Sequence, residues 1–196
     1  MVLLIYGVRL PPLCQKPHKI LNLNPKQIYI TNKDLKLSIE SIALEEIEFS
    51  ELIDSTYFGE CAKTVEIAFN TPTSFKVEGK YQFYPTVRHI FYSLISKYDA
   101  VASDNQIYSE EILDQFIRHI DIIRYNLRSR NFQLEGVRIP GFVGTVTLKI
   151  RGPQQFVNLV NMLLKFGEYS GVGIKTSIGM GSLSIENRER SKSVGQ

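Results

Sequence analysis

The sequence predicts an α+β fold in which helices cover one face of an antiparallel sheet, and three observations support this prediction. Between residues 63 and 186, segments with alternating apolar residues recur, as they do in half-buried strands. Segments with apolar residues at helical spacing lie between them. Finally, 43% of the 196 residues are hydrophobic and 22% are charged, which suits a chain with a folded core.

The first strand and the helices that follow it are clearly marked. In KTVEIAF (63–69) every second residue is apolar, and NTPTSF (70–75) is predicted to be a turn. The segment TVRHIFYSLISKY (86–98) carries one wide apolar stripe at helical spacing. A further helix is predicted after Ser109, whose hydroxyl can cap the first turn. The apolar face of that helix comprises Ile112, Leu113, Phe116, Ile117 and Ile120.

Two strands, a helix and a last strand complete the region. Residues 123–128 are predicted to be a strand with Ile123, Tyr125 and Leu127 on one side and Arg124, Asn126 and Arg128 on the other. Residues 142–151 form a second strand, and SRNFQLEGVRIPG (129–141) is predicted to be a long, irregular hairpin between the two. Pro153 opens the helix, and SLSIE (182–186) is the final strand.

This order of elements is the split βαβ arrangement of a ferredoxin-like (RRM-like) βαββαβ domain, with one additional helix. Its sheet packs helices on one face and exposes the other, and many RNA-binding domains are built in this way. The fold hosts many unrelated activities, so a function must be argued from a site.

The residues before this region are less regular. Residues 2–9 are predicted to be one buried strand, residues 10–34 mainly loop because they contain four prolines, and residues 35–40 a strand. No apolar run approaches the roughly 18 residues that a membrane span needs. Cys14 and Cys61 follow no metal or redox spacing, which suits a reducing cytoplasm.

Charge is unevenly distributed along the chain. Residues 34–60 contain eight acidic residues and one lysine, whereas residues 124–151 contain six basic residues and one acid. A strongly basic segment indicates a surface that faces a polyanion. A basic face that is merely solvated accounts for the charge equally well.

The stretch GVGIKTSIGMG (171–181) contains four of the thirteen glycines in the chain. A P-loop needs four residues between its first glycine and its Gly-Lys pair, and a dinucleotide fingerprint needs a third glycine at Thr176, so neither pattern fits. Glycines let an RNA backbone approach closely, exposed amides bind anions, and Lys175 adds positive charge. The alternative is a glycine-rich turn that only lets helix and strand pack together.

Four stretches resemble one known family when they are taken together and in order. They are FNTPTSF (69–75), FYPTVRHIFYSLISKY (83–98), GFVGTVTLKIRG (141–152) and FGEYSGVGIKTSIGMG (166–181). As a set they resemble the C-terminal domain of the CRISPR repeat-processing endoribonuclease, the sixth Cas protein, which belongs to the RAMP superfamily. The resemblance covers residues 63–186, and residues 2–56 resemble the end of that family's first ferredoxin-like domain.

The resemblance implies an activity and a partner. Members of the family bind CRISPR repeat RNA and cut it without metal or cofactor, by attack of a 2′-OH on the neighbouring phosphate. That chemistry needs a base, an acid and positive groups around the phosphate. Other CRISPR effector subunits or a second copy of the chain are further candidate partners, and no membrane is implied.

The catalytic residues stay unassigned. In the family a histidine early in the first domain commonly serves as acid or base, and Met1 aligns near that domain's third strand. His89 and His119 are expected to be surface residues, and His18 lies in a loop. We therefore expect that a chain beginning at Met1 binds repeat RNA but cleaves it poorly.

The RNA-binding residues are better defined. Lys175, with Gly171, Gly173, Gly179 and Gly181, matches the glycine-rich loop of the family. Arg128, Arg130 and Arg138 flank or occupy the predicted hairpin, and Lys149 and Arg151 are predicted to share one side of their strand. Arg88 matches a recurrent basic position, or it pairs with an acid. Tyr81, Phe83 and Tyr84 stack on bases or, more in keeping with their pattern, pack in the core.

These inferences define three predicted segments. Residues 1–60 are assigned to a partial N-terminal ferredoxin-like domain, residues 61–187 to the C-terminal domain, and residues 188–196 to a flexible tail. Two functions stay open at this point. One is a metal-independent endoribonuclease that processes CRISPR precursor RNA, and the other is an RNA-binding subunit that does not cut.

Overall fold

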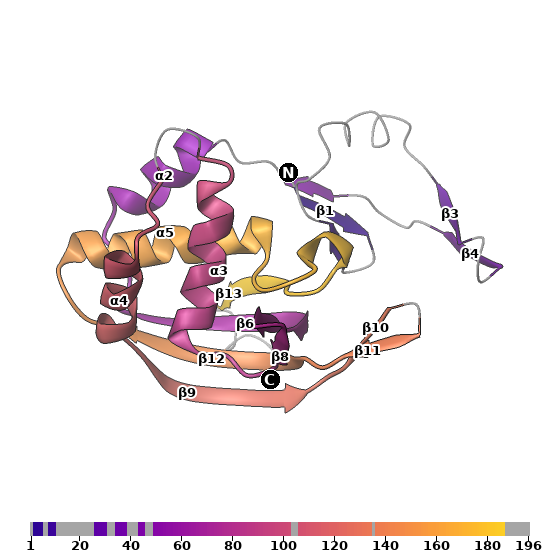
Figure 1. Cartoon of the computed structure of the whole chain (residues 1–196). Helices are drawn as coiled ribbons and strands as arrows, with labels where there is room; N and C mark the ends of the chain where they lie inside the picture. The colour runs from indigo at the N-terminus through magenta and orange to yellow at the C-terminus, as the bar shows by residue number, and fades with distance from the viewer. Residues whose placement is uncertain are drawn as a thin grey trace, which may run out of the picture.

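The computed structural model of the chain describes residues 2–5, 8–10, 26–30, 34–38, 43–45, 49–102, 106–134 and 136–186 (Figure 1). The helices are α2 (Phe49–Tyr57), α3 (Val87–Asp99), α4 (Glu110–His119) and α5 (Gln154–Ser170), and the 3₁₀ helix η2 (Thr176–Ile178) follows α5. The first strands are β1 (Val2–Ile5), β2 (Val8–Leu10), β3 (Gln27–Ile30), β4 (Leu35–Ser38) and β5 (Ala43–Glu45). The remaining strands are β6 (Thr64–Thr73), β7 (Phe75–Val77), β8 (Lys80–Gln82), β9 (Ile120–Ser129), β10 (Phe132–Leu134), β11 (Val137–Ile139), β12 (Phe142–Ile150) and β13 (Leu183–Glu186).

The central feature is a four-stranded antiparallel sheet with the strand order β13-β6-β12-β9. This is the order that the βαββαβ connectivity of a ferredoxin-like domain produces, with α3 and α5 as its two helices and α4 as the additional one. The helices lie together on one side of the sheet (Figure 1). The predicted fold class is therefore confirmed.

The core lies between the sheet and its helices. The alternating apolar residues of β6 are buried, as are Val146 and Leu148 of β12, and Ile67 lies directly opposite Val146 in the ladder. From the helices, Ile90, Leu94 and Leu163 are fully buried against them. Ser109 accepts a hydrogen bond from the N–H of Ile112, so α4 begins where the capping pattern predicts, and Thr86 caps α3 in the same way, which was not predicted.

Three local predictions are wrong. The NTPTSF segment is not a turn, because β6 continues to Thr73 and β7 begins at Phe75. In β9 a register shift leaves Ile123 between the partners of Thr147 and Leu148, so its side chain is 52% exposed and Ile122 packs against the core instead. Within residues 2–9 there are two antiparallel strands, β1 and β2, rather than one.

The part of the chain before residue 61 is only partly described. Strands β2, β1 and β5 form one small sheet, and β3 pairs with β4. Helix α2 belongs by packing to the main core, where the side chain of Leu52 is 2% exposed. The assignment of residues 1–60 to a separate domain stays a prediction. The predicted tail, residues 188–196, lies outside the described residues.

Asn158 of α5 joins α2 and the segment that follows it to the core. Its side-chain amide donates to the carbonyls of Tyr57 (2.8 Å) and Gly59 (2.6 Å), and its Oδ1 accepts from the backbone N–H of Cys61 (3.3 Å). Because the Asn158 side chain is buried and its three bonds are part-buried, removing the amide is costly: three backbone groups lose their partner at once.

Among the described residues, none of the helices combines the length and the apolarity that crossing a lipid bilayer requires.

We expect the Asn158→Leu variant to be about 1–3 kcal/mol less stable than the wild type, because leucine removes three part-buried hydrogen bonds to backbone groups. Asn161→Leu is the matched control, since this half-buried residue on the same helix makes one exposed bond to the Ala62 carbonyl and one part-buried bond to the Val157 carbonyl of its own helix. Urea unfolding followed by circular dichroism measures both. Equal losses in the two variants would contradict a special role for Asn158.

Candidate functional site

The segment 171–181, termed the glycine-rich loop, is fixed to the C-terminal end of β6. The N–H of Gly181 donates to the carbonyl of Pro72 (3.1 Å), and the N–H of Ile174 donates to the carbonyl of Ser74 (3.0 Å). Across the loop, the N–H of Val172 donates to the carbonyl of Gly181 (2.8 Å). The loop is therefore hydrogen-bonded to the end of the sheet at both Ile174 and Gly181 (Figure 1).

Glycine is needed at two positions because backbone atoms approach too closely for any side chain. A Cβ on Gly181 would lie 1.9 Å from the carbonyl oxygen of Val172, and one on Gly173 would lie 2.4 Å from that of Ser74. Both residues also have positive φ. These glycines are thus explained by the packing of helix, loop and strand, which was the alternative interpretation of the pattern.

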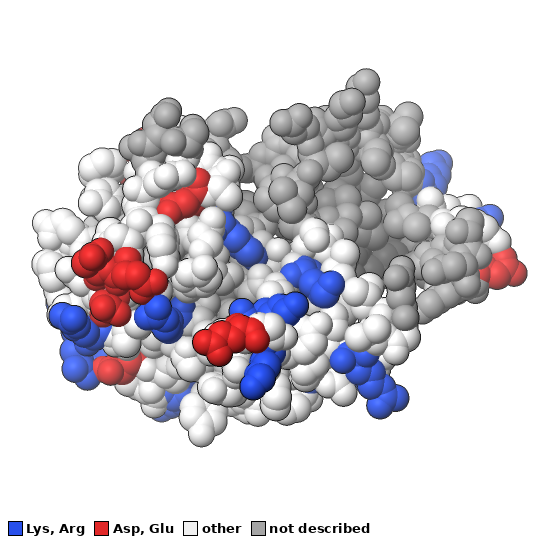
Figure 2. Space-filling model, viewed as in Figure 1, with Lys and Arg blue, Asp and Glu red and all other residues white. Residues whose placement is uncertain are grey.

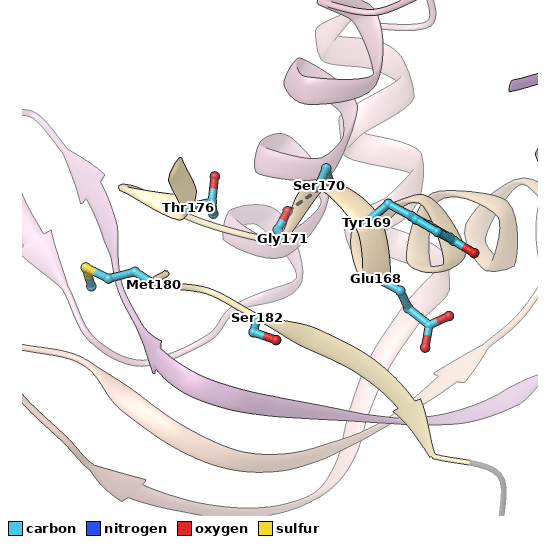
Figure 3. Close-up of a pocket in the computed structure, with 7 residues that line it drawn as sticks. All are labelled: Glu168, Tyr169, Ser170, Gly171, Thr176, Met180 and Ser182. Atoms are coloured by element: carbon cyan, nitrogen blue, oxygen red, sulfur yellow. Dashed lines mark hydrogen bonds between the residues drawn. The ribbon is translucent and has the colours of Figure 1, made fainter. Parts of the chain in front are cut away.

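Little empty space lies beneath the loop. The cavity between it and the end of α5 has a volume of about 10 Å³ and is lined by Ser170, Thr176 and Met180 among others (Figure 3). That volume holds at most about one water molecule. Any larger ligand must therefore bind on the outer surface of the loop.

Lys97 of α3 holds the loop from the side. Its ammonium group donates to the carbonyls of Ser170 (3.3 Å) and Gly171 (3.1 Å) and to the hydroxyl of Thr176 (3.1 Å). Two of these acceptors lie at the C-terminal end of α5, where the helix dipole favours a cation. Burial lowers the pKa of Lys97 to about 7. Sequence patterns gave no indication of this role, since a lysine on the polar edge of a helix usually extends into solvent.

The outer tip of the loop carries the group that the sequence analysis emphasised. Lys175 is exposed and has left-handed backbone geometry, with a φ of 55°. Most loop amides donate within the protein: those of residues 172–174, 178 and 179–182 all have acceptors. Within the described part of the chain, the amides of residues 175–177 have no hydrogen-bond acceptor. The loop amides that could bind an anion are therefore fewer than the sequence suggested, and they lie at this tip.

Three of the predicted arginines lie at the same end of the sheet. Arg128 and Arg130 line a surface groove of about 380 Å³ together with Asn70 and Pro72, the residue that bonds to Gly181. Arg138 lies in the β10–β11 hairpin, which projects from this end (Figure 1). The groove and the glycine-rich loop thus flank the end of β6.

Lys149 and Arg151 are not part of this arrangement. Lys149 pairs in register with Thr64, whereas Phe142 at the other end of β12 pairs with Thr73. Lys149 lies seven residues beyond Phe142 along the strand, or about 23 Å. Arg151 also forms an ion pair with Asp121. A single basic path through all the predicted residues is therefore not supported by their positions.

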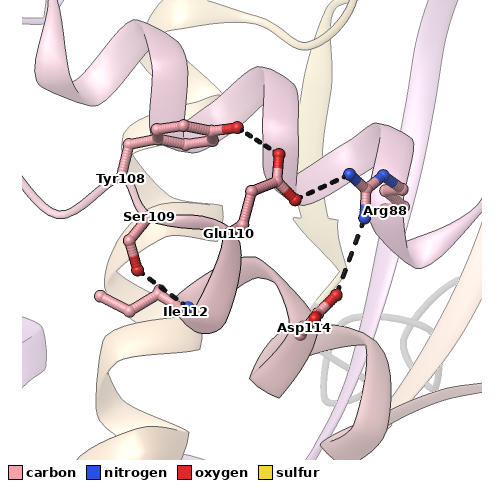
Figure 4. Close-up of polar contacts among 6 residues, drawn as sticks. All are labelled: Arg88, Tyr108, Ser109, Glu110, Ile112 and Asp114. Carbon is pink, nitrogen blue, oxygen red and sulfur yellow. Dashed lines mark hydrogen bonds and ion pairs between the residues drawn. The ribbon is translucent and has the colours of Figure 1, made fainter.

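Arg88 pairs with acidic side chains, which was the alternative to a role in RNA binding. Its guanidinium pairs with Glu110 (2.9 Å) and lies 3.8 Å from Asp114, both on α4 (Figure 4). Tyr108 donates to the same Glu110 carboxylate (2.7 Å), and these hydrogen bonds lower the pKa of Glu110. Acidic side chains gather over α4, and basic side chains spread over the middle of the same face (Figure 2).

The histidines differ from expectation. His18 lies outside the described residues. His89 and His119 are not fully exposed: His89 stacks on Phe75 at a ring distance of 5.2 Å, and His119 packs against Phe156. Burial is the main cause that lowers the pKa of His89, and its Nδ1 has no hydrogen-bond partner in the described structure.

Phe83 and Tyr84 are exposed, contrary to the expectation of core packing.

We expect the stability of the wild type to rise relative to Lys97→Met between pH 7 and pH 9. The folded lysine releases its proton near pH 7, while the unfolded lysine keeps it to about pH 10.5, so the unfolded state binds more protons in this range. The gain is about 1 kcal/mol per pH unit. Denaturant unfolding at several pH values measures it, with the exposed Lys63→Met as control. A pH-independent difference would contradict the burial of this amine.

Comparison with known proteins agrees with the geometry. The profile of the family described as CRISPR-associated endoribonuclease Cas6 matches residues 67–183. The CRISPR-associated endoribonuclease Cas6 of Streptococcus thermophilus is 38% identical over 154 residues, and the match covers 79% of this chain. The chain spans 63% of the length of that relative.

Solved structures show the same fold. A Cas6 product complex superposes with a TM-score of 0.74 at 20% identity, over 95% of this chain and 82% of that one. The Cas6 structure from Thermus thermophilus superposes with a TM-score of 0.60 at 26% identity, over 68% of this chain and 57% of that one. The family match spans more than half of the sequence and includes the glycine-rich loop and the sheet that carries it. The chain belongs to the CRISPR-associated endoribonuclease Cas6 family.

Proposed function

We propose that this chain binds CRISPR repeat RNA at the loop end of its sheet and takes part in the endoribonucleolytic processing of CRISPR precursor RNA. The observation that carries the proposal is that the glycine-rich loop, which presents Lys175, and the Arg128–Arg130 groove meet at the same strand end, because Pro72 of β6 lines the groove and bonds to Gly181 of the loop. Membership of the Cas6 family supplies the class of RNA and the class of reaction.

The residues at this end suit a phosphate backbone. Lys175 and the amides of residues 175–177, which have no acceptor among the described residues, can present positive charge and N–H donors to one phosphate group. Arg128 and Arg130 face the neighbouring groove, where planar guanidinium groups can bind further phosphates in bidentate fashion. Because the loop is packed from below and held by Lys97, these donors are positioned before RNA arrives, which reduces the entropic cost of binding.

Cleavage of the RNA would take place at a phosphate bound by these groups. A 2′-OH adjacent to the bound phosphate attacks it, the 5′-oxygen of the next nucleotide leaves, and the products are a 2′,3′-cyclic phosphate and a 5′-OH. Positive groups around the phosphate stabilise the charge that develops. The general base and acid stay unassigned, and the non-catalytic alternative is that this chain binds repeat RNA without cutting it.

The decisive experiment incubates end-labelled repeat RNA from the organism's own CRISPR array with the 196-residue protein in EDTA, and identifies the product ends. A 2′,3′-cyclic phosphate supports the endoribonuclease. Tight binding without cleavage supports the non-catalytic alternative, as expected if the acid–base groups are absent, since each contributes about 10²- to 10⁴-fold in rate. Failure to bind the RNA would refute both functions.

The same proposal places the chain in the cytoplasm. The free thiol of Cys61 is compatible with a reducing compartment.

We expect Lys175→Ala to weaken repeat-RNA binding with little loss of stability, because the side chain is exposed and lies in the loop tip. Loss of one phosphate contact should reduce the slope of log affinity against log salt by about 0.7–0.9. Filter binding over a salt series measures both quantities, and Lys63→Ala provides an exposed lysine at the opposite end of the sheet. An unchanged slope would remove the loop tip from the RNA site.

We expect the double substitution Arg128→Glu and Arg130→Glu to weaken binding far more than Lys149→Glu with Arg151→Glu. The first pair lies beside the loop, whereas the second lies at the other end of the sheet, where Asp121 already pairs with Arg151. The two double variants carry the same change in net charge. Equal losses of affinity would indicate nonspecific attraction of RNA to a basic protein.

A further inference from the structure

A second and larger groove lies beside the glycine-rich loop on the helical side of the domain. Its volume is about 600 Å³, within the range of about 300–1,000 Å³ that small-ligand sites occupy. We call it the Tyr92 groove, after the α3 residue in its wall. Strand β7 forms one wall, α3 and the start of α4 form the other, and Gly173 and Ile174 of the loop close one end.

The charges along the Tyr92 groove largely cancel. Arg88 is paired with Glu110, and Lys76 is balanced by Glu78 on the neighbouring turn. The ammonium group of Lys97 is directed to the loop oxygens. This balance distinguishes the Tyr92 groove from the Arg128–Arg130 groove, and it suits an uncharged ligand better than a phosphate.

The walls offer aromatic surface and hydroxyl groups instead. Tyr92 and Tyr108 are 50% and 42% exposed and form an edge-to-face pair at a ring distance of 5.8 Å. In such a pair, one ring leaves both of its faces free of the other. The hydroxyl of Ser96 donates to the Tyr92 carbonyl, so its oxygen can still accept a hydrogen bond.

The Tyr92 groove is joined to the loop through Ser93. The hydroxyl oxygen of Ser93 accepts a hydrogen bond from the N–H of Gly173 at 2.8 Å. Its hydroxyl hydrogen has no acceptor among the described residues and can be donated to a ligand. A molecule in the groove is therefore in contact with the same segment that presents Lys175 two residues later.

We propose that the Tyr92 groove binds the base of one unpaired RNA nucleotide, stacked on a tyrosine ring, next to the phosphate held at the glycine-rich loop. This inference rests on the proposed function, since it assigns a second contact to the same RNA. The groove provides what a base needs: aromatic surface for stacking and hydrogen-bonding groups for its edge. It makes the chain selective for RNA with an unpaired nucleotide at that position.

The test uses the 196-residue protein and its own repeat RNA, with 2-aminopurine substituted at one position at a time. We expect protein binding to change the fluorescence strongly at one unpaired position, and Tyr92→Ala to abolish that change. Tyr92→Phe should restore it because the ring is kept. Tyr125→Ala is the matched control, since this tyrosine is 72% exposed on β9, away from the groove.

A protein–RNA double-mutant cycle gives the second measurement. Tyr92→Ala, or an abasic nucleotide at the identified position, should each lower affinity by about 5- to 100-fold, the equivalent of one base–aromatic stack. The abasic nucleotide should have no further effect on Tyr92→Ala, because each change removes the same contact.

The outcomes separate the two proposals. Wild-type protein that fails to bind the repeat in a filter assay refutes the proposed function and this inference with it. Normal binding, with the same fluorescence change in Tyr92→Ala as in the wild type or with additive losses in the cycle, refutes the base site alone. Loss of folding in Tyr92→Ala would be detected by circular dichroism, and Tyr92→Leu, which removes the ring but keeps an apolar side chain, then replaces it in the cycle.

Discussion

The hydrogen bonds between the glycine-rich loop and the end of β6 are the constraint on which the candidate site depends. The N–H groups of Gly181 and Ile174 donate to the carbonyls of Pro72 and Ser74. These bonds fix the course of the chain between α5 and β13. The Arg128–Arg130 groove shares Pro72, and the Tyr92 groove shares Gly173 and Ile174. The positions of both grooves therefore depend on the end of β6.

Lys97 shows how hydrogen bonds from one side chain can hold such a loop in place. One ammonium group satisfies two carbonyls at the end of α5 and a hydroxyl in the loop. The cost is the partial burial of a charge, which is expressed as a lowered pKa. Rigid positioning of this kind suits a surface whose ligand is flexible, because the ordering cost then falls on the ligand alone.

Much of the fold could be predicted from the sequence because periodicity reports directly which side of an element is buried. The alternation in β6 and the stripe of α3 identified core residues, and Ser109 marked the start of α4. The shift at Ile123 was not predictable, since a bulge inserts one residue without changing the apolar content of the strand.

The candidate site was only partly predictable. The glycine pattern identified the loop, and the arginines near the hairpin followed from the element order. The distance between Arg128 and Lys149 was hidden because both belong to one hairpin of strands in sequence, although they lie at opposite ends of the sheet. Lys97 and Ser93 were missed because contact between a helix face and a loop about 80 residues away leaves no local pattern.

The anchoring of α2 on α5 by Asn158 and Leu52 bears on how such a protein changes in evolution. A recombination event at the start of β6 would separate the asparagine from the three backbone groups that it satisfies, and would expose the apolar site that Leu52 fills. The segment that ends near residue 61 and the helix more than ninety residues later are thus inherited most easily as a pair. Exchange between relatives is expected to preserve this pairing even where the sequence between them diverges.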